Sequence, residues 1–315
     1  MLKHIVVALE GAESHSTAPP CVLDCAAEIG ARTGAEIVIL HVEPRDSSEL
    51  ESLTPFQLEG VVEATDEAEL SRIAHTREEQ RGLQHRVEEK WPVRVDPQVA
   101  RGPVRLTTER LIRLQHGDML VARYGEARCK AGYLATLPER VVRELDVPVL
   151  FLAAGTCQML HGLERVLVPL DGSRYAESIL PLAREFLPPE SGSLHLLLVV
   201  PAHTTLNALR HGRGPLASRK NGEAYLDSVA ARPELAGIRI ERTVLEGVDP
   251  AEAIQSVAQS AHTSLVAMMT RDRGALERMV AGSVAHRILK ELRVPLLLWR
   301  SPARARAASP TSSGE

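Results

Sequence analysis

Four pairs of consecutive residues in this chain are of types that can bind a ligand. Glu10–Gly11 and Asp171–Gly172 each follow a short apolar run, and Ala135–Thr136 and Gly282–Ser283 each precede an apolar helical stretch. In open α/β sheets, ligands bind just beyond the carboxyl ends of strands, where the two acid–glycine pairs are expected. A Gly–Ser step at the start of a helix can offer backbone N–H groups and a hydroxyl to a phosphate. These residues either bind a ligand, with a phosphate as a candidate group, or serve only as turn and cap residues.

Motifs for other chemistries are missing from the sequence. There is no Walker A sequence, no HExxH metal motif and no GxSxG nucleophile elbow. The 12 histidines show no metal-ligand spacing and no acid–base pair stands out, so we predict neither a catalytic residue nor a metal site. His41, at the end of an apolar run, either contacts a ligand or packs as a structural residue. Cys21 and Cys25 are either buried apolar residues of one helix face or a redox or metal pair.

Composition excludes several classes of protein. Of the 315 residues, 44% are hydrophobic, 25% are charged and only 3% are aromatic, and the net charge is −4. Neither stacked rings nor a basic excess is therefore available for binding nucleic acid. The sequence has no run of about 18 apolar residues and no signal peptide, which predicts a cytoplasmic protein without membrane contact.

The chain contains an internal repeat. Residues 4–14 resemble residues 165–175, and residues 140–150 are identical to residues 287–297 at six of eleven positions. The two pairs are offset by 161 and 147 residues, a difference of 14 that loop insertions accommodate at low cost. We therefore predict two similar domains at 1–153 and 163–300, a linker at 154–162 and a disordered tail at 301–315.

Each copy has the pattern of alternating strands and helices. Continuous apolar runs predict strands buried on both faces, and alternation with helices predicts a parallel sheet covered on both sides. The expected strands are 5–9, 36–42, 93–99, 119–122 and 147–152, then 166–170, 193–200, 238–244, 265–269 and 294–299. The expected helices are 21–33, 61–90, 107–115 and 137–145, then 176–186, one within 217–231, 250–261 and 284–292.

Both copies resemble universal stress protein domains. The matching residues are VLVPLDGS at 166–173, the step Gly282–Ser283 and the closing Val–Pro–Leu–Leu at 294–297. For each copy the resemblance implies an α/β fold, a doubly wound five-stranded parallel sheet of the adenine-nucleotide alpha-hydrolase-like type with strand order 3-2-1-4-5. It also implies that the two final strands pair, so that the chain is an intramolecular pseudo-dimer. The resemblance leaves open whether two chains associate into a homodimer.

The resemblance further implies an adenine-nucleotide site, whose nucleoside end lies after the first two strands of a copy. The second copy keeps the aspartate and the valine of the family there, whereas the first has a glutamate in place of the aspartate. The residues implied at this end are Pro169, Asp171 and Val200 in the second copy and Ala8, Glu10 and Val42 in the first.

The phosphate end of that site is incomplete in both copies. The family pattern is Gly-x-x-Gly, nine residues, then Gly–Ser or Gly–Thr. The second copy keeps Gly282 and Ser283 but has Met269 and Asp272 at the other two glycine positions. The first copy keeps Gly125 and Thr136, with Ala122 and Ala135 at the remaining positions. Glycine allows the backbone to approach a phosphate closely, so its loss weakens the predicted site.

We therefore expect a regulatory stress-response protein that binds ATP or AMP weakly, or in one copy only, without being an enzyme. The alternatives are a nucleotide-independent scaffold for an unidentified protein partner, a weak ATPase, and a protein that holds a small apolar ligand near Val200, Met268 and Met269. A basic cluster within 210–220 is either part of a solvated loop or a contact for an anion or a partner.

Overall fold

The chain folds into two compact units. The computed structural model describes residues 2–9, 21–44, 67–102, 104–124, 147–153, 163–200, 218–270, 284–291 and 294–300. Unit 1 comprises Met1–Leu145 and Val149–Cys157, and unit 2 comprises Asp146–Pro148 and Gln158–Glu315. The expected linker at 154–162 and tail at 301–315 lie outside the described residues. The domain limits drawn from the repeat, and the pairing of the two final strands, stay predictions.

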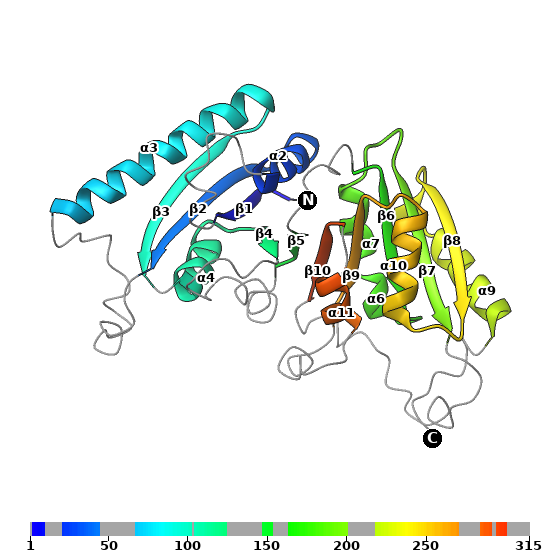
Figure 1. The fold of residues 1–315 in the computed structure, drawn as a ribbon. Coiled ribbons are helices and arrows are strands. Elements are labelled where there is room, and N and C mark those ends of the chain that lie inside the picture. Colours follow the sequence, from blue (N-terminus) through cyan, green and yellow to red (C-terminus); the bar gives the residue numbers. More distant parts are fainter. Residues whose placement is uncertain are drawn as a thin grey trace, which may run out of the picture. The chain divides into compact units, whose positions relative to one another are not determined.

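Unit 1 is built on five parallel strands in the order β3-β2-β1-β4-β5 (Figure 1). The strands are β1 (His4–Leu9), β2 (Glu36–Pro44), β3 (Val95–Gly102), β4 (Met119–Tyr124) and β5 (Val149–Ala153), and the helices are α2 (Cys21–Thr33), α3 (Glu67–Lys90) and α4 (Val104–Leu114). Helices α2 and α3 pack against each other on one face of the sheet, where Gly30 of α2 lies against Ile37. Helix α4 covers the other face, where Ile112 and Val6 meet beside Gly117.

Unit 2 repeats this arrangement, with the strand order β10-β9-β6-β7-β8. Its strands are β6 (Arg165–Leu170), β7 (Ser193–Val200), β8 (Arg239–Glu246), β9 (Leu265–Met269) and β10 (Leu296–Trp299). Its helices are α6 (Arg174–Glu177), α7 (Leu180–Glu185), α9 (Arg219–Ala230), α10 (Pro250–Ser260) and α11 (Val284–Glu291), with a 3-10 turn η5 (Pro233–Leu235). In both units the central strand is the first one, and the predicted doubly wound α/β fold with strand order 3-2-1-4-5 is confirmed.

The predicted helix at 176–186 is wrong, because the structure divides this segment into α6 and α7. Pro181 lies in the first turn of α7 and has no N–H, so it cannot donate to the carbonyl of Glu177 as a continuous helix requires. Helix α6 therefore ends at Glu177, with Ser178 as its C-cap. The predicted helix at 137–145 and the first residues of that at 61–90 lie outside the described residues.

Aliphatic side chains make up most of the core, as the low aromatic content predicts. Strands β1, β6 and β7 are almost entirely buried, and Phe151 and Phe186 are aromatic rings among the fully buried side chains. Within the described ranges, no helix combines the length and the hydropathy that crossing a bilayer requires.

Candidate functional site

The carboxyl ends of the strands in unit 2 bring three of the predicted positions to one edge of the sheet. After β6 the chain forms β7 and β8 on one side and then returns to β9 on the other side of β6. Such a switch in strand order opens a crevice at the carboxyl ends of the two diverging strands. Asp171 directly follows β6, Val200 ends β7 and Met269 ends β9.

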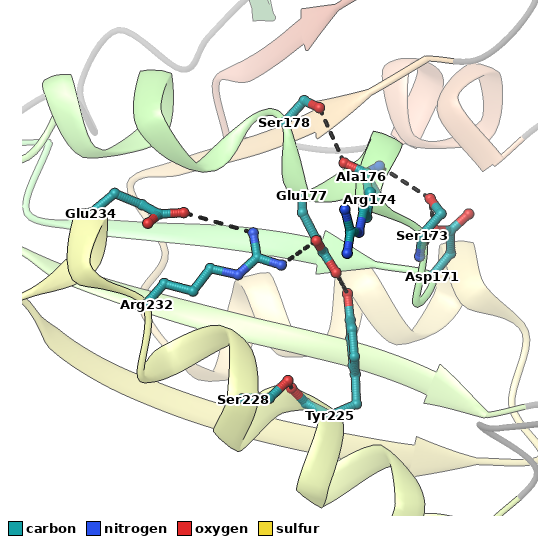
Figure 2. A network of polar contacts seen from close by, with 10 residues as sticks. All are labelled: Asp171, Ser173, Arg174, Ala176, Glu177, Ser178, Tyr225, Ser228, Arg232 and Glu234. Atoms are coloured by element: carbon teal, nitrogen blue, oxygen red, sulfur yellow. Dashed lines mark hydrogen bonds and ion pairs between the residues drawn. The ribbon is translucent and has the colours of Figure 1, made fainter. Parts of the chain in front are cut away.

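The turn after β6 holds the Asp171 carboxylate in a defined orientation (Figure 2). The backbone N–H and the hydroxyl of Ser173 both donate to Asp171 Oδ1, at 3.0 and 2.5 Å. Ser173 Oγ in turn accepts from the backbone N–H of Ala176 at 3.1 Å and caps α6. Gly172 has a φ of +81°, a backbone conformation that glycine adopts without the strain a Cβ would cause. The exposed carboxylate is thus fixed by local hydrogen bonds, and Gly172 and Ser173 are needed to form the turn.

A buried acid network lies directly behind this turn (Figure 2). Glu177 of α6 is only 5% exposed. Tyr225 of α9 donates its hydroxyl to Glu177 Oε1 at 2.8 Å, and the guanidinium of Arg232 donates to Oε2. Burial, followed by the hydrogen bond to Glu177 and the nearby charge of Asp171, raises the pKa of Tyr225 above its usual range. The network therefore keeps a charged carboxylate paired inside the unit and ties α6 to α9.

Sequence reasoning did not identify this network. Tyr225 and Arg232 are 48 and 55 residues from Glu177, so no local spacing connects them. A second contact from α6 is equally distant in sequence: the hydroxyl of Tyr175 donates to the carbonyl of Thr270 at 2.6 Å, just after β9. The two contacts fix the helix that follows Asp171 to both sides of the crevice.

The other predicted residues of the nucleoside end contribute differently. The side chain of Val200 is buried, and its carbonyl accepts from the backbone N–H of Gly247 at 3.0 Å. Pro169, within β6, is half-buried. In unit 1, Ala8 is nearly buried within β1, and Val42 is half-buried near the end of β2.

The remaining predicted site residues, Glu10, Gly125, Thr136, Gly282 and Ser283, lie outside the described residues. Near the phosphate end of unit 2, the structure therefore describes helix α11, which begins at Val284, directly after Ser283.

Strand register corrects two of the sequence correspondences. Leu9 pairs with His41 in unit 1, as Leu170 pairs with Leu198 in unit 2. The counterpart of Val42 is therefore Val199 and not Val200.

Register also changes the counterpart of Met269, which counting back along the chain gave as Ala122. The pairs Val6–Leu120 and Leu167–Val266 make it Arg123. Counting residues along the chain gives only the number of residues between two motifs. It does not show which residues lie side by side on neighbouring strands, so it misses both one-residue shifts.

Helix α11 is held to the start of α10 by charge. Asp249 caps α10 by accepting from the backbone N–H groups of Ala251 at 2.9 Å and Glu252 at 3.2 Å. Arg287 of α11 donates to Asp249 Oδ1 at 2.7 Å. The hydrogen bond from the Glu252 N–H, together with the Arg287 guanidinium, lowers the pKa of Asp249. This clamp fixes the helix that follows the predicted Gly282–Ser283 step.

The structure describes the side chain of Cys25, which belongs to helix α2 of unit 1. Cys25 is free and buried, and its burial raises the pKa of the thiol, which therefore stays protonated and unreactive. In the part of the chain that the structure describes, no three His, Cys, Asp or Glu side chains gather to hold a metal ion.

Comparisons with known proteins agree with the fold of both units. Residues 162–300 match the model of the universal stress protein family. A universal stress protein of Methanocaldococcus jannaschii is 28% identical over 148 residues, which cover 45% of this chain and 84% of the relative. The crystal structure of a universal stress protein from Archaeoglobus fulgidus aligns with 95% of this chain and 98% of its own, with a TM-score of 0.65 and 17% identity.

A universal stress protein solved in complex with cAMP aligns with 45% of this chain and 99% of its own, with a TM-score of 0.33 and 14% identity. The family model covers unit 2, and the Archaeoglobus fulgidus structure extends the agreement in fold to both units. Residues 162–300 therefore form a domain of the universal stress protein family.

Proposed function

We propose that this protein is a regulator whose unit 2 binds an adenine nucleotide, ATP or AMP, without turning it over. The observation that carries the proposal is the Asp171 carboxylate, which Ser173 holds in place at the crevice between β6 and β9. An exposed carboxylate with a fixed orientation accepts hydrogen bonds from the hydroxyl or amino groups of a nucleoside. Because its position is set before the ligand arrives, little freedom is lost on binding.

The surroundings of the crevice support nucleotide binding by keeping its walls in place. Glu177, Tyr225 and Arg232 hold α6 on one side, and the Arg287–Asp249 clamp holds α11 on the other. Gly282 and Ser283 stay the predicted phosphate contacts at the start of α11. The nucleoside end keeps the residues of the family, whereas the phosphate end lacks two of its glycines, so the expected affinity for the nucleotide is low. Low affinity suits a regulatory protein that responds to changes in nucleotide concentration.

Binding without turnover rests on the roles of the acidic residues. Glu177 is already held by Tyr225 and Arg232, so it is not available as a general base. Asp171 accepts two hydrogen bonds from Ser173, which hold its carboxylate in place as a hydrogen-bond acceptor for a ligand.

The test is calorimetric titration of the full chain with ATP, AMP and cAMP. We expect Asp171→Asn to weaken binding by about 10- to 100-fold, because the variant loses a charged acceptor. Glu190→Gln is the matched control, since Glu190 is exposed and precedes β7 at the opposite end of the sheet. Unchanged affinity in Asp171→Asn, or no binding at millimolar nucleotide, would reject the proposal in favour of the nucleotide-independent scaffold. Phosphate release that Asp171→Asn abolishes would instead show an ATPase.

A further inference from the structure

Strands β6 and β9 separate early on the way to the crevice of unit 2. Their ladder ends at the pair Leu167–Val266, whereas the equivalent ladder of unit 1 continues by one pair, Val7–Val121. The carbonyl of Arg165 accepts from the residue before β9, so the odd-numbered residues of β6 direct their backbone groups to β9. The next of these after Leu167 is Pro169, which has no N–H to donate. The proline therefore opens the gap between the two strands one pair earlier than in unit 1.

The side chain of Tyr175 bridges this gap at its carboxyl end. Tyr175 belongs to α6, which follows β6, and its hydroxyl donates to the carbonyl of Thr270, the residue after β9, at 2.6 Å. A hydrogen bond between these two points places the phenol ring across the opening that Asp171 borders on the β6 side. Tyr175 is half-buried, as a ring in this position would be. The bond from Tyr175 to Thr270, called the tyrosine bridge below, therefore spans the crevice.

Both ends of the tyrosine bridge are held by other contacts. On the β6 side, Ser173 caps α6, and Glu177 ties the same helix to α9 (Figure 2). On the β9 side, Thr270 is buried, and its backbone N–H donates to the carbonyl of Trp299 in β10 at 2.8 Å. The bridge thus joins two parts of unit 2 that are already fixed, so its position over the crevice is defined.

The tyrosine bridge lies between the two ends of the nucleotide site proposed above. Asp171 and Val200, at the nucleoside end, follow β6 and end β7. Gly282 and Ser283, the predicted phosphate contacts, come after β9 in the chain and directly before α11. A ligand that reaches from the first two residues to the other two has to cross the gap between β6 and β9. A phosphate chain that extends this way meets the ring of Tyr175.

We propose that Tyr175 sets the ligand specificity of unit 2 by barring the route from the nucleoside end to the phosphate end. This inference rests on the function proposed above, and it narrows the ligand to AMP in preference to ATP. AMP brings its base and ribose to the nucleoside end and has a single phosphate, which stops short of the tyrosine bridge. The two further phosphates of ATP have to pass it, which breaks the hydrogen bond to Thr270 and leaves a part-buried carbonyl without that donor.

The experiment is calorimetric titration of the full chain with AMP and with ATP. We expect the wild type to bind AMP more tightly. Tyr175→Ser removes the ring and installs the residue that the first copy of the repeat has at this position, Ser14. It should raise the affinity for ATP about tenfold relative to that for AMP, because ATP then no longer breaks a hydrogen bond.

Two further variants separate the tyrosine bridge from a general effect on α6. Tyr175→Phe keeps the ring and removes only the hydroxyl, so it should shift the ratio of the two affinities in the same direction by a smaller amount. It also provides the measurement if Tyr175→Ser folds poorly. Ser178→Ala is the control, because the Ser178 hydroxyl donates to the Arg174 carbonyl within the same segment and makes no contact across the gap. It should leave the ratio unchanged.

The proposal is overturned if the wild type binds ATP at least as tightly as AMP. It is also overturned if Tyr175→Ser leaves the ratio unchanged, whether the two affinities stay constant or fall together. In either case the nucleotide site itself stands if Asp171→Asn weakens the binding of both ligands. Absence of binding of both nucleotides, in the wild type and in Tyr175→Ser, would instead reject the proposed function together with the role of Tyr175.

Discussion

Units 1 and 2 have the same strand order and differ in the described residues at the carboxyl ends of their strands. In unit 2 a short helix, α6, follows the central strand, and a paired carboxylate inside the unit ties it to α9. In unit 1 the long helix α3 packs against the edge strand β3, and the side chain of Gln80 in this helix is buried. The aliphatic interior of the strands fixes the fold in both units. The residues at the strand ends differ between the units, since His41 and Arg123 of unit 1 correspond in register to Leu198 and Met269 of unit 2.

The largest expected effect is on the stability of unit 2 alone. Arg232→Ala leaves the Glu177 carboxylate buried without its cationic partner, which costs about 3 kcal/mol in the free energy of unfolding. The pair lies within unit 2, so we expect calorimetry to show one unfolding transition moving to lower temperature. Arg239→Ala is the matched control, because Arg239 is 75% exposed beside Glu241 and a surface pair contributes little. An equal shift in both variants would contradict the role of the buried pair.

A smaller effect concerns the pH dependence of unit 2. His195 Nε2 lies 2.8 Å from Thr243 Oγ1, and burial lowers the pKa of the imidazole, with Glu241 opposing and Arg165 reinforcing this shift. A lowered pKa means that the unfolded chain takes up the proton first, so unit 2 loses stability as pH falls through the unfolded value of about 6.5.

Val38 is the register counterpart of His195 in unit 1, which makes His195→Val the variant that removes the difference between the units. Denaturant unfolding between pH 7.5 and 5 should show a smaller loss of stability on acidification in this variant than in the wild type. A parallel loss in both proteins would assign the pH dependence to other groups.

The smallest effect is expected at the clamp between α10 and α11. The depressed pKa of Asp249 means that its contribution to stability is present above the unfolded pKa and is lost as pH falls through the lower folded value. Asp249→Asn should therefore be less stable than the wild type at pH 6, and the difference should shrink below pH 4. Urea unfolding at the two pH values measures it. Asp227→Asn, in an exposed pair with Arg242, is the control and should show a smaller difference at pH 6.

Much of the fold is predictable from local patterns. Helix α2 and strands β7 and β9 have the predicted limits, because each is a continuous apolar or helical pattern between clear turn residues. The edge strand β3 is displaced by two to three residues from the prediction. Its side chains are mostly half-exposed, so its apolar pattern is weak. The division of 176–186 follows from Pro181, whose missing N–H interrupts a pattern that is otherwise helical.

The candidate sites are only partly predictable. Asp171 could be placed after a strand from its position between an apolar run and glycine, and the structure puts it at the crevice. The burial of Glu177 and Gln80 could not be predicted from the sequence, because residue type alone does not distinguish a buried Glu or Gln on a helix from an exposed one. Whether such a residue is paired depends on segments far away in the chain.

The sequence by itself determined that two similar parallel α/β units exist and that an aspartate follows the central strand of the second. Those features arise from burial patterns and turn residues within short stretches of chain. Only the tertiary structure decided that Glu177 is paired, that Gln80 is buried, and that Arg123 is the counterpart of Met269. These facts depend on strand register and helix packing, which are set by the fit of whole elements against one another rather than by the residues of any one element.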